Sequence, residues 1–375
     1  MTSDVTDDLV IALMYYSPYV SGLTNVARDV AEGLVRRGRR VTVVATRSSP
    51  DLAREEVING VRVVRTPVIA RIGRGAVSPT FAVEVVKATA RAKVANLHLP
   101  LLEAGPITRF SRCPVVLTYH CDVSLPPGLL NSAQTTIMDA SSRIAMRHAT
   151  AVTVTSEDYA QHSRLWRSIQ PSMVAIPPPI EPVPTGRPAY RETNGLHVGF
   201  LGRIVQEKGL DHLVRGFRNL DDPDARLLIG GDFSQIAGGS VVEQVRQAIG
   251  GDPRARMLGF VPDDRLGDFY ASLDVFALPS VNAFEAFGIV QAVAMLAGVP
   301  VLASNLPGVR LPVQQTGFGA IVPPGDSDAI GVALAKLAAN PPDRERGAAA
   351  ARDSFWMNNV LDAYEAVLDK AASTE

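Results

Sequence analysis

The sequence predicts an α/β protein made of two doubly wound domains, and three observations carry this prediction. Short apolar runs rich in valine and isoleucine alternate with longer helical patterns along most of the 375 residues. Six prolines within residues 176–188 interrupt the alternation once, after which it starts again. Hydrophobic residues make up 46% of the chain and charged residues 20%, which supplies apolar side chains for two cores and excludes a disordered protein.

The first half, residues 1–178, is expected to form a parallel sheet covered on both faces, because its strands are continuously apolar. In its first helix Val26, Val30 and Leu34 recur at helical spacing. Strands are expected at Leu9–Tyr16, Val41–Thr46, Val61–Thr66, Ala95–Leu99, Val115–His120, Ala151–Ser156 and Val174–Pro177. Helices are expected at Leu23–Arg37, Thr80–Lys93, Pro127–Arg147 and Glu157–Ser168.

Residues 179–194 are expected to form a stiff linker, because proline lacks the N–H that a sheet needs and fixes φ. The second half, residues 195–355, repeats the pattern of the first. Its expected strands are Leu196–Gly202, Arg226–Gly230, Ala255–Val261, Val275–Pro279, Val299–Ala303 and Ala320–Val322. Its expected helices are Leu210–Leu220, Ser240–Ile249, Asp264–Ser272, Ala286–Leu296 and Asp328–Ala339. Residues 356–375 are expected to form a helix that packs back across the hinge.

This architecture predicts where a ligand binds. In open α/β sheets ligands lie beyond the carboxyl ends of the strands. Two sheets that face each other are therefore expected to share one cleft between the domains.

Composition excludes several classes of protein. Cys113 and Cys121 are too few for a disulfide framework and form no CxxC zinc pair. Residues 1–8 are polar and acidic, unlike the start of a signal peptide. No apolar run approaches the ~18 residues that a membrane span needs. We expect a cytoplasmic protein, and we expect no nucleic-acid partner.

The loop after the first strand is a weak candidate for phosphate binding. Gly22 and Thr24 lie where backbone amides at a helix N-terminus can meet a phosphate. The loop is not a GxGxxG sequence, and that dinucleotide fingerprint occurs nowhere in the chain. An ordinary helix cap explains the same residues.

The segment 202–209, GRIVQEKG, leaves the first strand of the second half and enters a helix. Arg203 and Lys208 bracket this loop, where two cations and helix-end amides can hold a diphosphate. Only five of the 37 basic residues are lysines, so a lysine beside a helix start favours phosphate binding over a solvated charged loop.

A second loop, FEAFGIVQ at 284–291, precedes the apolar helix Ile289–Leu296. A carboxylate at Glu285 can accept hydrogen bonds from sugar hydroxyls, while the amides near Gly288 can bind a phosphate. A carboxylate that is simply favoured by the helix dipole is the alternative.

Two histidines end strands of the first half. His120 follows an apolar strand and precedes Asp122, a position that favours a ligand cleft over the core, and His98 is a weaker candidate. The string Asp222–Asp224 resembles a metal-binding pair, but its central proline indicates a turn. No metal is expected.

Together these segments resemble the retaining glycosyltransferases of family 4, whose GT-B fold consists of two Rossmann-like domains facing across a cleft. The resemblance runs from Tyr16 to about Asn340 and is carried by GR and EKG within 202–209, EAFGIV at 285–290, LPGV at 306–309 and VPPGD at 322–326. It implies sugar transfer, with retention and without a metal or other cofactor. The donor would be a nucleotide-diphosphate sugar on the C-terminal domain, and the acceptor a lipid-linked, polysaccharide or natural-product hydroxyl on the N-terminal domain.

The resemblance also implies roles for single residues. Arg203 and Lys208 would hold the diphosphate, Glu285 the donor sugar, and His120 would lie near the sugar C6 hydroxyl. Gly22 would lie beneath the diphosphate. The remaining donor-binding positions are Gly202, Phe287, Gly288, Ile289 and Val290.

Two positions depart from the family pattern. A second glutamate that holds the ribose is replaced by Val293, and a glycine pair after the first strand is replaced by Ser21 and Gly22. Loss of a charged hydrogen bond costs about 1.5–3 kcal/mol, which weakens a site without abolishing it. Two alternatives therefore stay open: a nucleotide-sugar-binding protein without catalysis, and a GT-B-fold nucleotide-sugar epimerase.

The acceptor side carries a basic stretch between Arg62 and Lys93. Seven basic residues, Arg62, Arg65, Arg71, Arg74, Lys87, Arg91 and Lys93, stand there against one acid, Glu84. Apolar residues such as Phe81 and Val83 lie among them, a pattern that can hold an anionic membrane surface. The expectation is peripheral contact at the inner face of the membrane, with an ordinary amphipathic helix as the alternative.

Overall fold

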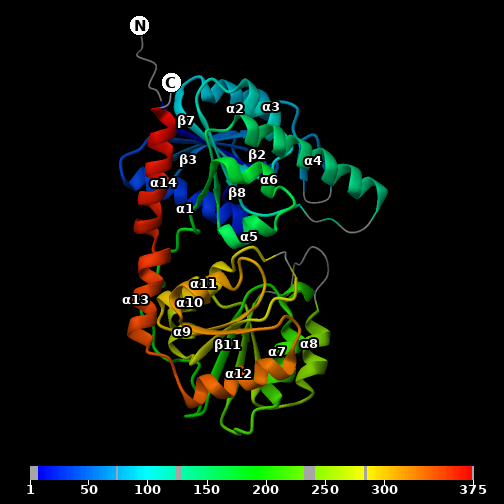
Figure 1. The fold of residues 1–375 in the computed structure, drawn as a ribbon, viewed down its shortest axis with the longest axis vertical. Coiled ribbons are helices and arrows are strands. Elements are labelled where there is room, and N and C mark those ends of the chain that lie inside the picture. Colours follow the sequence, from blue (N-terminus) through cyan, green and yellow to red (C-terminus); the bar gives the residue numbers. More distant parts are fainter. Residues whose placement is uncertain are drawn as a thin grey trace. The chain divides into compact units, whose positions relative to one another are not determined.

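The computed structural model describes residues 7–72, 75–123, 125, 128–231, 241–282 and 285–373 (Figure 1). The chain divides into two compact units, and its last helix belongs to the first of them. Unit 1 comprises Met1–Pro179 with Met357–Glu375, and unit 2 comprises Ile180–Trp356. Among the described residues, no helix is both long enough and apolar enough to cross a membrane.

Unit 1 is built on an eight-stranded sheet with the order β10-β9-β8-β7-β1-β2-β4-β3. Its strands are β1 (Asp7–Ala12), β2 (Val41–Thr46), β3 (Glu55–Ile58), β4 (Val61–Thr66), β7 (Ala92–Leu99), β8 (Val115–Tyr119), β9 (Ala151–Val154) and β10 (Met173–Ala175). All neighbours pair in parallel except β3, which is antiparallel to β4 at the edge. A separate hairpin pairs β5 (Ala70–Ile72) with β6 (Gly75–Val77).

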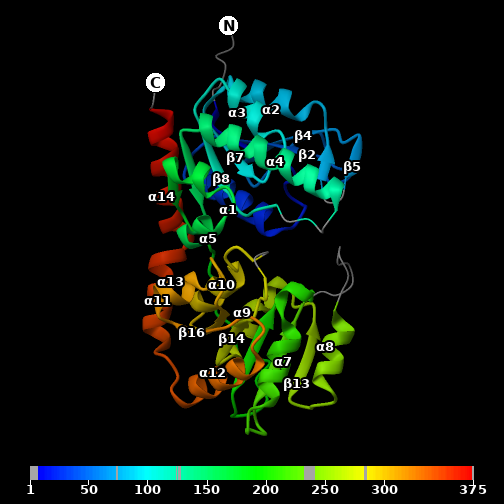
Figure 2. The same ribbon diagram turned by 45° about the vertical axis from the view of Figure 1, so that its right-hand side comes forward.

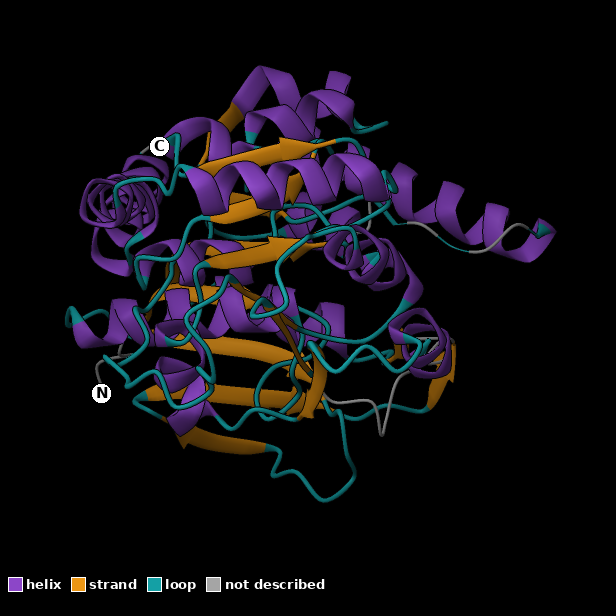
Figure 3. Ribbon diagram, turned by 90° about the horizontal axis from the view of Figure 1, so that it is seen from below, coloured by secondary structure: helices purple, strands orange, loops and turns teal. Residues whose placement is uncertain are grey.

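Helices of unit 1 pack against its sheet. Figure 3, which colours the whole chain by secondary structure, shows strands lying between helices. The helices of unit 1 are α1 (Gly22–Arg36), α2 (Phe81–Thr89), α3 (Ala104–Phe110), α4 (Leu129–His148), α5 (Glu157–His162), α6 (Trp166–Ile169) and α14 (Met357–Ala372), with the 3₁₀ turn η1 (Gln170–Ser172). In α1 the Ser21 hydroxyl accepts a hydrogen bond from the Thr24 amide at 3.1 Å, which caps the helix.

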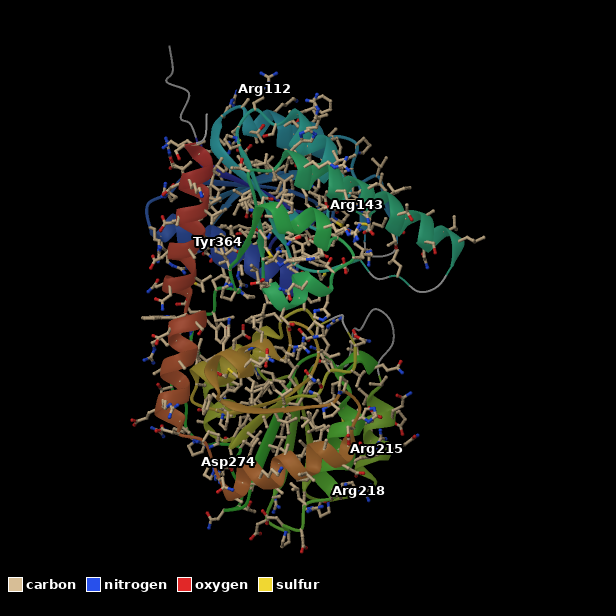
Figure 4. All side chains as sticks on the ribbon, viewed as in Figure 1. Arg112, Arg143, Arg215, Arg218, Asp274 and Tyr364 are labelled. Carbon is tan, nitrogen blue, oxygen red and sulfur yellow. The ribbon has the colours of Figure 1, made fainter. Side chains whose placement is uncertain are left out.

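The C-terminal helix α14 runs along one side of unit 1 in both views (Figure 1, Figure 2). Arg37 pairs with Asp362 and Glu365 at 2.7 and 2.6 Å, which ties α14 to the end of α1. Leu361 is 1% exposed and lies over Gly33, where a side chain would collide with it. Tyr364, labelled in Figure 4, is buried, and burial raises its pKa to about 12. The last helix therefore completes the core of unit 1.

Unit 2 has six parallel strands in the order β13-β12-β11-β14-β15-β16. They are β11 (His197–Leu201), β12 (Arg226–Gly230), β13 (Ala255–Gly259), β14 (Val275–Leu278), β15 (Val301–Ser304) and β16 (Gly319–Val322). Its helices are α7 (Leu210–Arg218), α8 (Val242–Ile249), α9 (Leu266–Ala271), α10 (Ile289–Leu296), α11 (Leu311–Thr316), α12 (Ser327–Ala339) and α13 (Arg344–Phe355), with η2 (Gln206–Lys208) and η3 (Asp263–Arg265). Two apolar clusters, one including Phe276 and Phe355 and the other Phe200 and Phe217, form its core.

The proline-rich stretch crosses the boundary between the units. From Ile180 onward it belongs to unit 2: Ile180 is 3% exposed and its amide donates to the Phe355 carbonyl at 3.0 Å. Gly186 lies so close to Gly267 that any side chain there would overlap its backbone. Proline prevents this stretch from joining a sheet, and the chain instead lies against the surface of unit 2.

Several element boundaries differ from the sequence prediction. The first strand was expected to reach Tyr16 but ends at Ala12, because Tyr15 and Tyr16 are buried in a loop rather than in a strand. The edge strand β3 was missed, since its sequence EEVI is half exposed and polar. The helix expected at Glu157–Ser168 is split into α5 and α6, and α13 was not predicted.

Candidate functional site

The strand order of unit 2 places its switch point between β11 and β14. From β11 the chain proceeds outward to β12 and β13, and from β14 it proceeds outward in the opposite direction to β15 and β16. A doubly wound sheet opens a crevice at this point, beyond the carboxyl ends of its strands. The loop after β11 carries Arg203 and Lys208, and the loop after β14 carries Glu285. The sheet thus brings the two loops that carry the predicted donor-binding residues to one crevice.

The two loops are held together by their backbones. The Val281 amide donates to the Glu207 carbonyl at 2.9 Å. Gly209 has φ 60°, and a Cβ there would lie 2.3 Å from the Pro279 carbonyl oxygen. Only glycine allows both this conformation and this close approach, so Gly209 fixes where Lys208 stands.

Lys208 and Glu285 form an ion pair between Nζ and Oε2. The two side chains are 13% and 20% exposed, so each charge is mostly removed from water and is compensated by the other. Both residues are predictable from the sequence as site residues, but their contact is not, because it joins positions 77 residues apart.

Arg203 differs from Lys208 in its exposure. Its side chain is 56% exposed, and its guanidinium lies 3.6 Å from the Glu207 carboxylate, a weak surface contact within the same loop. The guanidinium is therefore accessible to a ligand anion. Gly202, at the start of the loop, has φ 152°.

Helix α10 begins at the same crevice. Gly288 caps it with φ 76°, and a Cβ there would lie 2.3 Å from the Leu278 side chain. The first amides of a helix, here those of Ile289 and Val290, have no acceptor within the helix and can meet an anion. The Phe287 side chain is 3% exposed and packs edge-on against Phe355, so only its backbone can serve a ligand.

Gln291 is a supporting residue that sequence analysis did not assign. It is fully buried, and its Nε2 donates to the Phe287 and Val309 carbonyls at 2.5 and 2.9 Å. These bonds anchor the loop that carries Glu285. Its position as a polar residue in the otherwise apolar helix Ile289–Leu296 is the feature of the sequence that could have identified it. Val293, two residues on, packs against the apolar cluster of unit 2 and contributes no polar group.

Unit 1 has its own switch point between β1 and β7. Gly22, the first residue of α1, lies just beyond β1, with open space where a Cβ would stand. His120 follows β8 and is only 7% exposed, more buried than a cleft residue was expected to be. Its Nε2 lies 2.9 Å from Nδ1 of His98. Burial lowers the pKa of His120 to about 4 and that of His98 well below its usual value, so both rings are neutral at pH 7.

Asp122 has a structural role. Its carboxylate accepts hydrogen bonds from the Tyr119 and Ser163 hydroxyls at 2.5 and 2.9 Å. Arg164 also lies near it, at 3.9 Å. These bonds hold the loop that follows β8, and burial together with the Asp122 charge raises the pKa of Tyr119.

The basic stretch of unit 1 is largely neutralised. Arg62, Lys87 and Lys93 pair with Glu55, Glu84 and Asp8, and Arg65 is 1% exposed and pairs with Glu56. Phe81 and Val85 are buried in the unit, while Val83 is 52% exposed. Arg74 lies outside the described residues. Strands β3 and β1 supply the acids that pair with Arg62, Arg65 and Lys93 from elsewhere in the sequence, whereas Glu84 is the acid already counted within the stretch. Peripheral membrane contact stays a prediction.

The described residues hold no group of three or more potential metal ligands. The Asp222 carboxylate accepts the Asp224 amide at 2.9 Å, which is the expected turn.

Comparisons with known proteins cover both units. A family model described as "Glycosyl transferases group 1" matches residues 187–354, and one described as "Glycosyl transferase 4-like domain" matches residues 21–179. A phosphatidyl-myo-inositol mannosyltransferase of Mycobacterium leprae is 28% identical over 94% of this chain and 95% of its own. A D-inositol 3-phosphate glycosyltransferase of Xylanimonas cellulosilytica is 30% identical over 68% of this chain and 65% of its own.

Solved structures share the fold. A sucrose-phosphate synthase from Thermosynechococcus elongatus superposes with a TM-score of 0.76 at 18% identity, over 98% of this chain and 99% of its own. The Anabaena protein HepE in complex with UDP gives 0.74 at 18% identity, over 97% of this chain and 100% of its own. The architecture is thus GT-B, with two Rossmann-like domains.

Proposed function

The chain belongs to the family 4 glycosyltransferases, and we propose that it moves a hexosyl group from a nucleoside-diphosphate donor to an acceptor hydroxyl with retention at the anomeric carbon. The observation that carries the proposal is the meeting of Arg203, Lys208 and Glu285 with the start of α10 at the switch point of unit 2. Two cations and free amides suit a diphosphate, and a carboxylate suits sugar hydroxyls.

The main task of such a site is to stabilise charge on the departing diphosphate. The guanidinium of Arg203 can take two phosphate oxygens at once, whereas Lys208 acts as a point charge. Because Lys208 is already paired with Glu285, a bound donor places this ammonium between its phosphate and the carboxylate. Glu285 then accepts hydrogen bonds from the sugar. No metal ion is needed for this arrangement.

Retention follows from attack on the same face of the sugar. The bond between the anomeric carbon and the phosphate oxygen breaks as the bond to the acceptor oxygen forms. The acceptor proton passes to a phosphate oxygen of the leaving group. Unit 1 binds the acceptor in this proposal. The two relatives described above are named for phosphatidyl-myo-inositol and D-inositol 3-phosphate, which define a first panel of acceptors.

The test is incubation of the full chain with UDP-, GDP- and ADP-hexoses and each member of that panel. Release of nucleoside diphosphate together with a glycosylated acceptor supports the proposal. An epimerised donor would instead identify an epimerase. Donor binding without turnover across the panel would support the alternative of a nucleotide-sugar-binding protein without catalysis.

A further inference from the structure

Two buried histidines lie side by side at the carboxyl edge of the unit 1 sheet. His98 is in β7. His120 follows β8, the strand that pairs with β7 in the sheet. Nδ1 of His98 lies 2.9 Å from Nε2 of His120, and the stacked rings have centroids 5.1 Å apart. His98 is 0% exposed, and its Nε2 has no hydrogen-bond partner within the described part of the chain.

The pair continues a row of polar side chains across the interior of the sheet. Two residues before each histidine, Asn96 donates to the Thr118 hydroxyl at 2.9 Å, and Thr153 lies 3.0 Å from the same hydroxyl. The neighbouring polar side chains are thus hydrogen-bonded to one another rather than to His98. His98 is therefore left with His120 as its hydrogen-bond partner among the described residues.

One hydrogen bond between two neutral rings allows two arrangements. In the first, the His98 Nδ1–H donates to His120 Nε2, so that His98 Nε2 is a bare nitrogen and the His120 proton sits on Nδ1. In the second, His120 Nε2–H donates to His98 Nδ1, and His98 then carries a proton on a buried Nε2 that has no acceptor. Orphaned buried N–H groups are rarer in proteins than under-satisfied acceptors. The first arrangement is therefore favoured.

We propose that His98 is a positioning residue that holds His120 as its Nδ1–H tautomer, so that His120 offers a hydrogen-bond donor to an oxygen of a substrate bound at the carboxyl edge of the unit 1 sheet. This inference rests on the proposed function for the identity of the ligand, but the tautomer itself does not. A ring fixed in this way cannot accept the acceptor's proton through Nδ1. That proton is left to the phosphate oxygen of the leaving group.

The tautomer can be read directly by ¹⁵N NMR on the full chain labelled at histidine. The six histidines are assigned by single substitutions. Two-bond couplings from the ring protons separate protonated from bare nitrogens. The proposal expects protonated Nδ1 on both His98 and His120. A protonated Nε2 on His120, or an average of both tautomers, would overturn it.

The effect on catalysis is tested by two substitutions of His98 and a control. His98→Asn keeps an N–H near the position of Nδ1, and His98→Leu removes it. We expect His98→Leu to remove the hydrogen bond that fixes the tautomer and orientation of the His120 ring, and to lower kcat at least tenfold with little change in KM for the donor. His98→Asn should stay within about threefold of wild type. His162→Leu, at an exposed histidine of α5, should change neither.

The outcomes separate this inference from the proposed function. A folded His98→Leu variant with wild-type kcat would contradict the positioning role. If His98→Leu does not fold, the wild-type spectrum and the Asn variant decide the matter. If the chain transfers no sugar at all, the proposed function fails, while the NMR result still decides the tautomer.

Discussion

Lys208 and Glu285 illustrate how one side chain can stabilise another before a ligand arrives. Both are mostly removed from water, and a lone charge in such a place is costly, so each depends on its partner. Arg203 makes only a 3.6 Å contact with Glu207 and stays exposed. The site therefore combines one cation fixed in advance with one free to fold over a diphosphate.

Removing either cation should impair turnover more than folding. We expect Arg203→Ala and Lys208→Ala each to lower kcat/KM at least ~10²-fold, comparable to the loss of one oxyanion-stabilising donor. Steady-state kinetics measure this. Arg215, an exposed arginine of α7 labelled in Figure 4, contacts Asp211 and His212 on its own helix, and Arg215→Ala is the matched control. Near-normal turnover in both the Arg203→Ala and Lys208→Ala variants would show that these residues do not bind the diphosphate.

The carboxylate should matter for the sugar rather than for the nucleotide. Glu285→Gln keeps the size of the side chain but removes its charge, which weakens hydrogen bonds from sugar hydroxyls. We expect most turnover to be lost while the affinity for nucleoside diphosphate, measured by calorimetry, stays within a few-fold. An equal loss of both would show that Glu285 acts only as the partner of Lys208.

At the level of elements, the site depends on two loops that meet at Gly209 and through the hydrogen bond from the Val281 amide to the Glu207 carbonyl. The loop after β11 reaches the loop after β14 because Gly209 adopts a left-handed conformation against the Pro279 carbonyl. The anchoring of the Glu285 loop by Gln291 is a further such contact. The crevice is thus shaped by backbone packing before any ligand-binding side chain is considered.

Gly209→Ala tests this packing against a matched glycine. Gly317, at the end of α11, has a similar φ of 64° but open space around its Cβ position. Gly317→Ala should cost only the backbone strain, about 1 kcal/mol of unfolding free energy. Gly209→Ala adds a steric clash and should also weaken nucleotide binding at least tenfold. Equal effects of the two variants on unfolding and on binding would show that the loops do not depend on this contact.

Much of the element order was predictable from the sequence, because continuous apolar strands and amphipathic helices are local patterns. The candidates at strand ends, including Arg203, Lys208 and Glu285, followed from the same patterns. The contacts between them did not. The Lys208–Glu285 and His98–His120 pairs join residues 77 and 22 positions apart, and they depend on which strands become neighbours. The edge strand β3 was missed because an exposed edge tolerates a polar sequence.

On the scale of the whole molecule, the chain returns from unit 2 to finish unit 1. Helix α14 supplies the buried side chains Leu361, Tyr364 and Leu368 to a core whose other residues precede position 180. Ion pairs from Arg37 and Arg39 hold the same helix. Unit 1 is therefore incomplete until the last residues of the chain have folded.

Leu361→Ala should destabilise unit 1 by about 2–5 kcal/mol, because it opens a cavity over α1. Trp166 in unit 1 and Trp356 in unit 2 are the two tryptophans of the chain, so a Trp356→Phe background lets fluorescence follow unit 1 alone during urea unfolding. Val332→Ala, at an exposed position of α12, should leave this transition unchanged. A wild-type midpoint for Leu361→Ala would mean that α14 is not part of the core.

The central claim is sugar transfer with retention by a site of amides and cations that needs no metal. The most direct measurement is ¹H NMR of the product formed from an α-linked nucleotide hexose by enzyme treated with EDTA. We expect an α-glycoside, formed at the same rate before and after chelation. A β-linked product, or activity that disappears with EDTA and returns with a divalent cation, would contradict it.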